Sequence, residues 1–241
     1  MSPLKKSAVG LVLFAFVGAA ALAWGQGGYV GEPTSDHDLS RLPAALTQLL
    51  DPHGTSIKDE VNGIPTILCQ VWWAKSIAAQ KEGPKSRDVL YGGLRPGALV
   101  GVLHFPSEGE DAIDQKLKAG FYTLRYAQLT PDDETQEASH GRFRDFLVVS
   151  PASADEHPDQ VLSLDELQKL SRLASRSTKP AIFPLVPFNP AYKQMPVVLT
   201  DGMGNCLMQV SLPGNLSDGS KSQPLEFAVI LLTPPKTTGE S

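Results

Sequence analysis

The stretch LKAGFYTLRY, residues 117–126, decides the fold because it has the pattern of a turn followed by a strand. Gly120 suits the positive φ that such a turn needs immediately before the strand. Successive side chains of a strand then point to opposite faces. One face carries Tyr122, Leu124 and Tyr126, and the other carries Phe121, Thr123 and Arg125. Only the first set forms an unbroken apolar stripe, so we expect it to face a core.

Other segments along the chain have the length, the β-branched and aromatic content and the flanking turn residues of strands. They are residues 56–61, 64–77, 98–105, 143–150, 181–188, 197–200, 205–212 and 225–232. Asn62-Gly63, between the first two, is the dipeptide that a tight hairpin favours. This pattern is typical of an antiparallel sandwich or barrel. We therefore predict a mostly-β protein, an antiparallel β-sandwich that forms a single domain over residues 39–233.

Two helices are expected beside the strands. Ser163 and Glu166 have the spacing of a capping box. The apolar stripe that follows consists of Leu164, Leu167, Leu170 or Ser171, and Leu173 or Ala174. This stripe predicts an amphipathic helix over about 164–175, which packs against a sheet face or closes one end of the sandwich. Leucines at helical spacing, with Pro43 in the first turn, predict a short N-terminal helix over about 41–50.

The turn before the strand at 121 has a counterpart earlier in the chain. Leu94-Arg95-Pro96-Gly97 precedes the strand at 98, as Leu117-Lys118-Ala119-Gly120 precedes the strand at 121. Both turns have a basic residue after the leucine and a glycine at the end. We expect the two strands to be neighbours that begin at similar turns.

The motif Leu-x-x-Gly-x-Tyr-Thr-Leu, residues 117–124, resembles the start of a strand in small exported bacterial β-sandwich domains, including transthyretin-like modules and families of unknown function. Residues 94–187 as a whole resemble uncharacterised exported proteins of environmental bacteria. The resemblance implies a β-sandwich fold. It implies no activity and no catalytic residue.

The N-terminus has the features of a secretory signal peptide, which we place at residues 1–23. Lys5 and Lys6 precede the uninterrupted run of apolar and small residues 8–23, and Ala21-Leu22-Ala23 provides a small-x-small cleavage site. The protein is then exported, to the periplasm or the extracellular space. The alternative is an uncleaved anchor, which would be the protein's only contact with the membrane. Residues 24–38 are expected to be flexible, and residues 234–241 to form a disordered tail.

Export changes the interpretation of Cys69 and Cys206. In an oxidising compartment the two cysteines can form a single disulfide. Both lie in apolar, strand-like segments, where a buried free thiol behaves as a small hydrophobic group. The sequence leaves these two alternatives open. The net charge of −5, with no basic cluster beyond the extreme N-terminus, argues against binding to nucleic acid.

The segment CQVWWAK, residues 69–75, offers a candidate binding surface. Alternation puts Trp73 on the face of Ile67, Cys69 and Val71, which indicates the core. Trp72 shares the opposite face with Gln70, where its indole is placed to stack a sugar ring or an apolar ligand. The alternative is that a helix or a second sheet covers Trp72.

The segment 139–146 offers a second candidate surface. Arg142 and Arg144 fall on one face of the expected strand, and Asp145 falls on the other. An inward Asp145 needs a partner, and we expect Arg125 on a neighbouring strand to provide it. This arrangement is either a buried structural ion pair or part of an anion site.

A metal site is the alternative to these surfaces. We consider a set formed by His104, His140 and His157, with Met195, Met203 and Met208 as further ligands for copper. The acidic segments 107–114 and 130–137 are candidate calcium loops, although neither has the spacing of an EF-hand.

No nucleophile signature or known metal motif is present, and no cofactor is implied. The sequence therefore predicts a non-enzymatic module of the cell envelope that binds a small ligand or a partner protein. Its alternative is a metal-binding protein or a metal-dependent hydrolase that uses the three histidines.

Overall fold

The structure is a computed structural model that describes residues 28–34, 36–61, 64–81, 83, 86–129, 143–221 and 223–234. Several sequence predictions fall outside these residues: the signal peptide at 1–23, the hairpin turn at 62–63, His140 and Arg142, the acidic segment 130–137 and residues 235–241 of the tail. None of the helices in the described residues is long and apolar enough to cross a membrane.

One large sheet of ten strands forms most of the fold, and every neighbouring pair in it is antiparallel. In spatial order its strands are β1 (Val30–Thr34), β2 (Gly54–Val61), β3 (Ile64–Trp73), β5 (Leu99–Phe105), β8 (Gly120–Gln128), β9 (Asp145–Pro151), β10 (Ala181–Val186), β14 (Leu225–Leu232), β12 (Cys206–Leu212) and β11 (Val197–Thr200). Two small sheets pair β6 (Gly109–Glu110) with β7 (Lys116–Leu117), and β4 (Ile77–Ala79) with β13 (Gly214–Leu216). The predicted mostly-β, antiparallel fold is confirmed.

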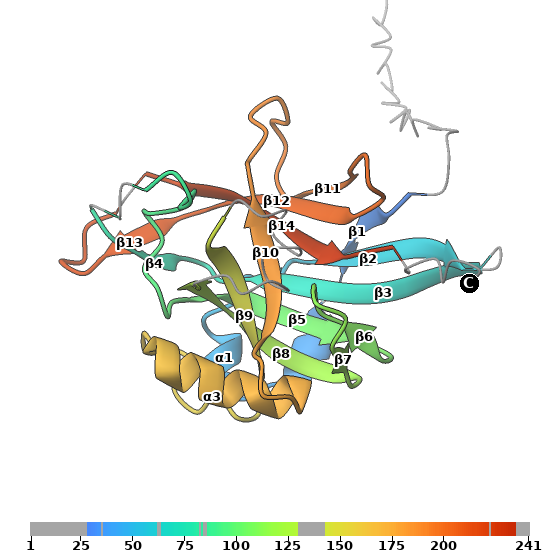
Figure 1. Ribbon diagram of the computed structural model, residues 1–241, viewed down its shortest axis with the longest axis horizontal. Helices are drawn as coiled ribbons and strands as arrows, with labels where there is room; N and C mark the ends of the chain where they lie inside the picture. Colours follow the sequence, from blue (N-terminus) through green and yellow to red (C-terminus); the bar gives the residue numbers. More distant parts are fainter. Residues whose placement is uncertain are drawn as a thin grey trace, which may run out of the picture.

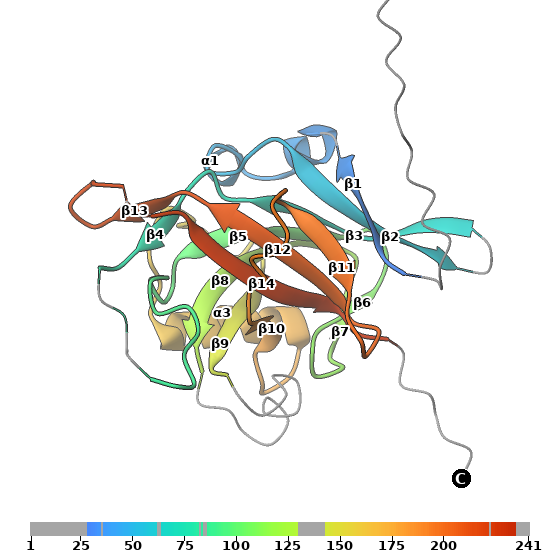
Figure 2. The same cartoon turned by 90° about the horizontal axis from the view of Figure 1, so that it is seen from above.

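The sheet curls until it is nearly barrel-shaped, so the two layers expected of a sandwich are parts of one continuous sheet. β10 makes the turn between the layers: its first half pairs with β9 and its last two residues pair with β14. In Figure 1, β10 runs across the gap between the lower layer and the upper layer of β11, β12 and β14. Figure 2 shows these upper strands lying over β5, β8 and β9.

At the other side the two edge strands approach each other. Tyr29 N donates a hydrogen bond to Thr200 Oγ1 at 3.1 Å. A Cβ on Gly31 would lie 2.6 Å from Cγ2 of Val198, so the strands come this close only because residue 31 is a glycine. Residues 30–34, which the sequence suggested were flexible, therefore form an ordered edge strand. Their pairing partners on β2 lie 20 to 28 positions further along the chain, from Thr34↔Gly54 to Val30↔Lys58, so no local pattern reveals the pairing.

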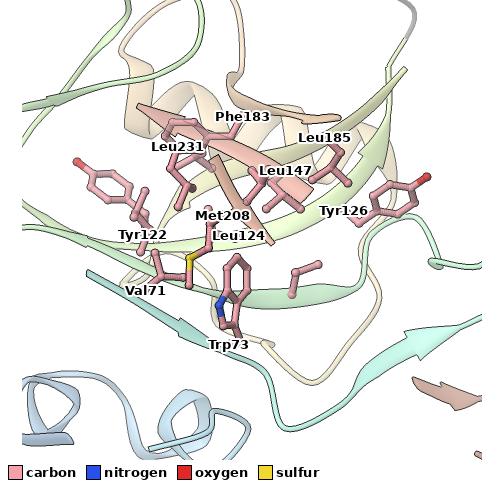
Figure 3. Packing of buried hydrophobic residues seen from close by; sticks show 14 of the residues in the cluster. Val71, Trp73, Tyr122, Leu124, Tyr126, Leu147, Phe183, Leu185, Met208 and Leu231 are labelled. Atoms are coloured by element: carbon pink, nitrogen blue, oxygen red, sulfur yellow. The ribbon is translucent and has the colours of Figure 1, made fainter. Parts of the chain in front are cut away.

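The interior between the layers is filled by apolar side chains from both (Figure 3). Tyr122, Leu124 and Tyr126 all point into it, as predicted. Trp73 packs edge-on against Phe227 of the opposite layer, with 5.7 Å between the ring centroids. Ile67 is 37% exposed instead of sharing the core with Trp73. The register with β2 shifts between Ile57 and Lys58, where Leu68 is an extra residue on β3, and this β-bulge changes the side that Ile67 faces.

The lower layer is also covered on its outer face, which explains why all seven residues of β5 are buried. The 3-10 helix η1 (Asp36–Arg41) and α1 (Ala44–Thr47) lie beside Trp72 and Val102. The helix α3 (Leu164–Ser175) covers β9 and parts of β8 and β10 (Figure 1). Its Leu167 belongs to the same buried cluster as Phe146 and Ile182. The second face of the strand at 121 is therefore buried as well, although its side chains are not all apolar.

The helix α3 has the predicted bounds and the predicted capping box. Glu166 N donates to Ser163 Oγ, and Ser163 N donates to Glu166 Oε2 at 2.8 Å. The buried face consists of Leu167, Ser171, Ala174 and Ser175, whereas Leu164 and Leu173 are exposed. The buried stripe therefore runs along Leu167, Ser171 and Ala174, and the predicted members Leu164 and Leu173 lie outside it.

The other predicted helix is shorter than expected. Only Ala44–Thr47 are α-helical, and Pro43 is the extended residue before them. The helix ends early because β3 binds the following backbone: Asp51 N donates to Trp73 O at 2.8 Å, and Leu50 bridges Ala74. The N–H groups of Leu49 and Leu50 close the helix with 3-10 bonds to Leu46 O and Thr47 O, and the chain then pairs with β3.

Cys69 and Cys206 are both free and fully buried in the interior. Burial raises the pKa of Cys206 to about 12, and it raises the pKa of Cys69 well above its usual value. The Cys206 thiol contributes to the shift at Cys69, so the two sulfur atoms are close enough to interact electrostatically.

We expect both thiols to resist alkylation in the native protein. At pH 8.5 the raised pKa keeps both thiols almost entirely protonated, so their thiolate fraction is far smaller than that of an exposed cysteine, and the reagent must also reach them. Mass spectrometry after iodoacetamide treatment, with and without denaturant, measures this. Two alkylated thiols only in denaturant are expected. Rapid native alkylation would contradict the burial, and absence of alkylation in denaturant without reductant would show a disulfide.

The capping box predicts a specific loss of stability. Ser163→Ala should lower the free energy of unfolding by about 1 kcal/mol, because it leaves backbone donors of the first turn without a partner. Urea unfolding followed by circular dichroism measures the change. Ser153→Ala, at an exposed serine in a turn with no hydrogen bond of its own in the described structure, is the matched control and should be neutral. Equal effects of the two substitutions would contradict the role of the cap.

Candidate ligand-binding groove

Trp72 is not a binding surface. Its side chain is 0% exposed and lies in the cluster formed with Leu39, Leu46, Leu50, Leu99, Val102 and Ala152. The alternative that a helix covers it is correct, because η1 and α1 supply the leucines on top of the indole. The segments that bury Trp72, η1 and α1, lie outside β3, so the alternation of side chains along β3 could not reveal them.

Gln70 and His104, two of the predicted site residues, do lie together. They are opposite each other on β3 and β5, and Gln70 Oε1 is 2.8 Å from His104 Nδ1. The His104 ring stacks on the Phe121 ring with 4.1 Å between the two centroids. The guanidinium carbon of Arg41 lies 5.4 Å from the centroid of the same Phe121 ring. Gln70 and His104 are only 6% and 7% exposed, so this polar row fastens η1 to the sheet instead of facing solvent.

The residues considered for a metal site do not gather within the described structure. No group of three or more histidine, cysteine, aspartate or glutamate side chains is placed to hold a metal ion among the described residues. His104 is buried whereas His157 is exposed, and Met208 is in the core whereas Met203 is 57% exposed.

The first acidic segment has a structural role. Asp111 is 2% exposed and accepts hydrogen bonds from the backbone N–H groups of Ile113, Gln115 and Ile182. Burial raises its pKa from the ordinary value. This carboxylate therefore ties the 111–115 turn to β10.

Asp145 is buried and points inward, as predicted, but its partner is not Arg125. Its carboxylate accepts hydrogen bonds from Tyr126 Oη at 2.6 Å, Leu90 N at 2.8 Å and Tyr91 N at 3.1 Å. Burial, together with the Asp145 charge, raises the pKa of Tyr126 far above its usual range. Arg125 is on the opposite face of β8, so the two side chains point away from each other.

Arg144 is also a structural residue. Its Nε donates to Leu129 O at 3.0 Å, and Nη1 lies 3.8 Å from the Asp88 carboxylate. Of the two alternatives for the segment 139–146, the described residues favour structural pairing over an anion site, since both Arg144 and Asp145 are bonded within the protein.

Arg125 forms a buried ion pair with Asp155. Its Nε donates to Asp155 Oδ2 at 2.8 Å and its Nη2 to Oδ1 at 2.9 Å, which is the fork geometry of a bidentate pair. The two side chains are 0% and 1% exposed. The remaining donors bind backbone carbonyls: Nη1 binds Gly97 O at 2.8 Å and Gln160 O at 2.7 Å, and Nη2 binds His157 O at 3.2 Å.

These bonds hold two separate backbone segments in place. One is the turn 94–97, in which Ala98 N donates to Arg95 O and Gly97 has a φ of 88°. Pro96 and Gly97 are the residues that a type II turn favours at these positions. The other is the loop 155–162, which also packs so tightly on Gly97 that a Cβ there would lie 1.9 Å from Leu162 O.

The turn and the loop are two walls of a groove. We call it the Arg95 groove and define it by its lining residues, which come from the segments 74–78, 95–99, 158–161 and 215–217 and from just after α1: Leu49, Ala74, Ser76, Ala78, Arg95, Ala98, Leu99, Pro158, Asp159, Gln160, Val161, Asn215, Leu216 and Ser217. Its volume is about 290 Å³. The third wall is the pair β4–β13, which Figures 1 and 2 both show projecting from one end of the sheet. A second depression continues from it along Arg95, Leu216 and Ser217.

The lining of the groove combines an apolar floor with polar groups at its walls. Ala98 and Leu99 are 2% and 8% exposed and form the floor with Leu49. Arg95, Asp159 and Asn215 stand at the walls, and Asn215 Nδ2 donates to Ser76 Oγ at 2.7 Å. Small-molecule sites in proteins have this composition, an apolar surface with a few fixed polar groups.

Of the predicted site residues, only Arg125 contributes to this groove. It does not line the groove, but its hydrogen bonds from the protein interior hold two of the walls in place. The groove itself was not predicted, since its walls come from four segments that are far apart in the chain. The one sequence signal was the turn Leu94-Arg95-Pro96-Gly97, which was interpreted as the start of a strand. That strand, β5, does pair with β8 as expected.

The chain was compared with known proteins at three levels. No protein-family model, no curated protein and no solved structure matches it. The resemblance to exported β-sandwich domains therefore stays a prediction.

Removal of the Arg125 guanidinium should be strongly destabilising. Arg125→Met leaves Asp155 buried without a counter-charge, which costs about 3–5 kcal/mol of unfolding free energy. The double variant Arg125→Met/Asp155→Leu should recover much of this loss, since no buried charge then remains. Arg87→Met, at an exposed arginine, is the control. Chemical unfolding measures all three, and a single variant as stable as the control would contradict the proposed role of the pair.

Proposed function

We propose that this protein is a non-enzymatic module that binds a small ligand in the Arg95 groove and acts outside the cytoplasm. The observation that carries the proposal is the groove's construction: two of its walls, at 95–99 and 158–161, are fixed by hydrogen bonds to one buried guanidinium. A preformed site loses little conformational entropy when a ligand binds, so the rigid walls favour binding.

The size of the groove supports a small ligand. A volume of about 290 Å³ is at the lower end of the range of ligand sites, roughly 300–1,000 Å³. A ligand of this size that also makes exposed polar contacts should bind with a dissociation constant on the order of 10 µM to 1 mM. The charge and length of residues 1–23 support export of the chain.

The proposal predicts where small molecules bind. In a screen of polar fragments followed by NMR, the largest chemical-shift changes should fall on residues 74–78, 95–99, 158–161 and 215–217. Ser217→Trp places a bulky side chain at the exposed rim of the groove and should weaken binding at least tenfold, because it fills the site.

Ser153→Trp is the matched control, since Ser153 is exposed and does not line the groove. It should leave binding unchanged. Shift changes that cluster elsewhere, or equal binding by the two tryptophan variants, would overturn the assignment of the groove as the binding site.

A further inference from the structure

We infer that the Arg95 groove takes a zwitterion, namely an α-amino acid with an apolar side chain. This inference rests on the proposed function and adds the ligand's chemical class. Three observations carry it: a guanidinium without a partner on one wall, a carboxylate without a partner on the neighbouring wall, and an apolar floor in the same groove.

Arg95 provides the cationic wall. Its backbone is fixed at both ends of the residue, since Arg95 N donates to Ala78 O and Arg95 O accepts from Ala98 N. Its side chain takes part in none of the hydrogen bonds or ion pairs of the described residues. A guanidinium presents a planar fork of N–H donors that matches the two oxygens of a carboxylate.

Asp159 provides the anionic wall. It lies between His157 and Gln160, whose carbonyl oxygens both accept hydrogen bonds from Arg125, so its backbone is anchored on either side. Its carboxylate is likewise in no ion pair of the described structure. Lys81, which lines the neighbouring depression, is paired with Asp218 at 2.7 Å.

The two charges face one groove without pairing with each other. The Arg95 guanidinium and the Asp159 carboxylate both line the groove, and no ion pair joins them within the described residues. A ligand with a single charge would pair with either Arg95 or Asp159. It would leave the other of these two side chains without a counter-charge. A ligand that carries a carboxylate and an ammonium on one carbon is complementary to both.

The apolar floor of the groove determines which ligand side chain binds best. Ala98, Leu99 and Leu49 line the groove below the two charges. An aliphatic side chain attached to the same carbon would bury apolar surface against them, which is favourable in proportion to the area removed from water. Branched aliphatic amino acids fit this combination, whereas strongly polar side chains would lose hydration without gaining a partner.

Isothermal titration with the twenty proteinogenic L-amino acids, each titrated individually into the full-length protein, tests the inference. We expect an apolar amino acid such as L-leucine to bind best. Two analogues of leucine then isolate each charge: 4-methylpentanoate lacks the ammonium group, and 3-methylbutylamine lacks the carboxylate. Each should bind about three- to tenfold more weakly than leucine, because partly exposed charge pairs contribute modestly.

Two variants match these analogues. Arg95→Gln should weaken leucine and 4-methylpentanoate but leave 3-methylbutylamine unchanged. Asp159→Asn should weaken leucine and 3-methylbutylamine but not 4-methylpentanoate. The double variant Arg95→Asp/Asp159→Arg should recover part of the leucine binding lost in Arg95→Asp alone. This pattern would establish which wall binds which charge.

The outcomes separate this inference from the proposed function. Binding of 4-methylpentanoate as tight as that of leucine, lost in Ser217→Trp, would overturn the zwitterion and leave the groove as a ligand site. Failure of all twenty amino acids would overturn the inference, and the fragment screen decides the proposed function independently. Leucine binding that Ser217→Trp does not affect would contradict both.

Discussion

The guanidinium of Arg125 is the interaction on which this end of the molecule depends. All five of its N–H donors are bonded inside the protein, to Asp155 and to three backbone carbonyls. A buried ion pair adds little net stability over an apolar replacement, because both charges lose their hydration. Its effect is on geometry. One rigid fork bonds the turn at 94–97 and the loop at 155–162 at once, and the groove exists between the segments that it fixes.

A second buried group joins the two layers of the sheet. Asp145 on β9 accepts hydrogen bonds from Tyr126 on β8 and from the backbone of Leu90 and Tyr91. The Tyr91 hydroxyl in turn donates to Val186 O on β10 and accepts from Ala228 N on β14. Because β10 changes partners from β9 to β14 at this point, the network secures the turn between the layers. The two polar networks thus lie on opposite faces of β8 and stabilise different parts of the fold.

The position of the groove follows from the way the sheet is covered. η1, α1 and α3 bury the outer face of the lower layer, and the interior between the layers is filled, so the strands of the lower layer present neither face to a ligand in the part of the chain that the structure describes. The open surface is left at the end where β4 and β13 extend beyond the ten-stranded sheet. This is why Trp72 and Gln70, on a well-formed strand, are buried, whereas Arg95, in a turn, is available.

The sequence by itself determined the elements whose signals are local. Ser163 and Glu166 specified the start of α3, alternation placed Tyr122, Leu124 and Tyr126 in the core, and the two similar turns indicated that β5 and β8 are neighbours. It also indicated that Arg125 and Asp145 must each have a partner inside the protein, since both are charged residues in otherwise apolar strands. Only the tertiary structure decided which partners they have. Arg125 and Asp145 point to opposite faces of adjacent strands, and Asp155, Leu90 and Tyr91 reach them from loops whose path no periodicity encodes. The groove was decided in the same way, because its walls meet only after the sheet has curled and Arg125 has joined two distant loops.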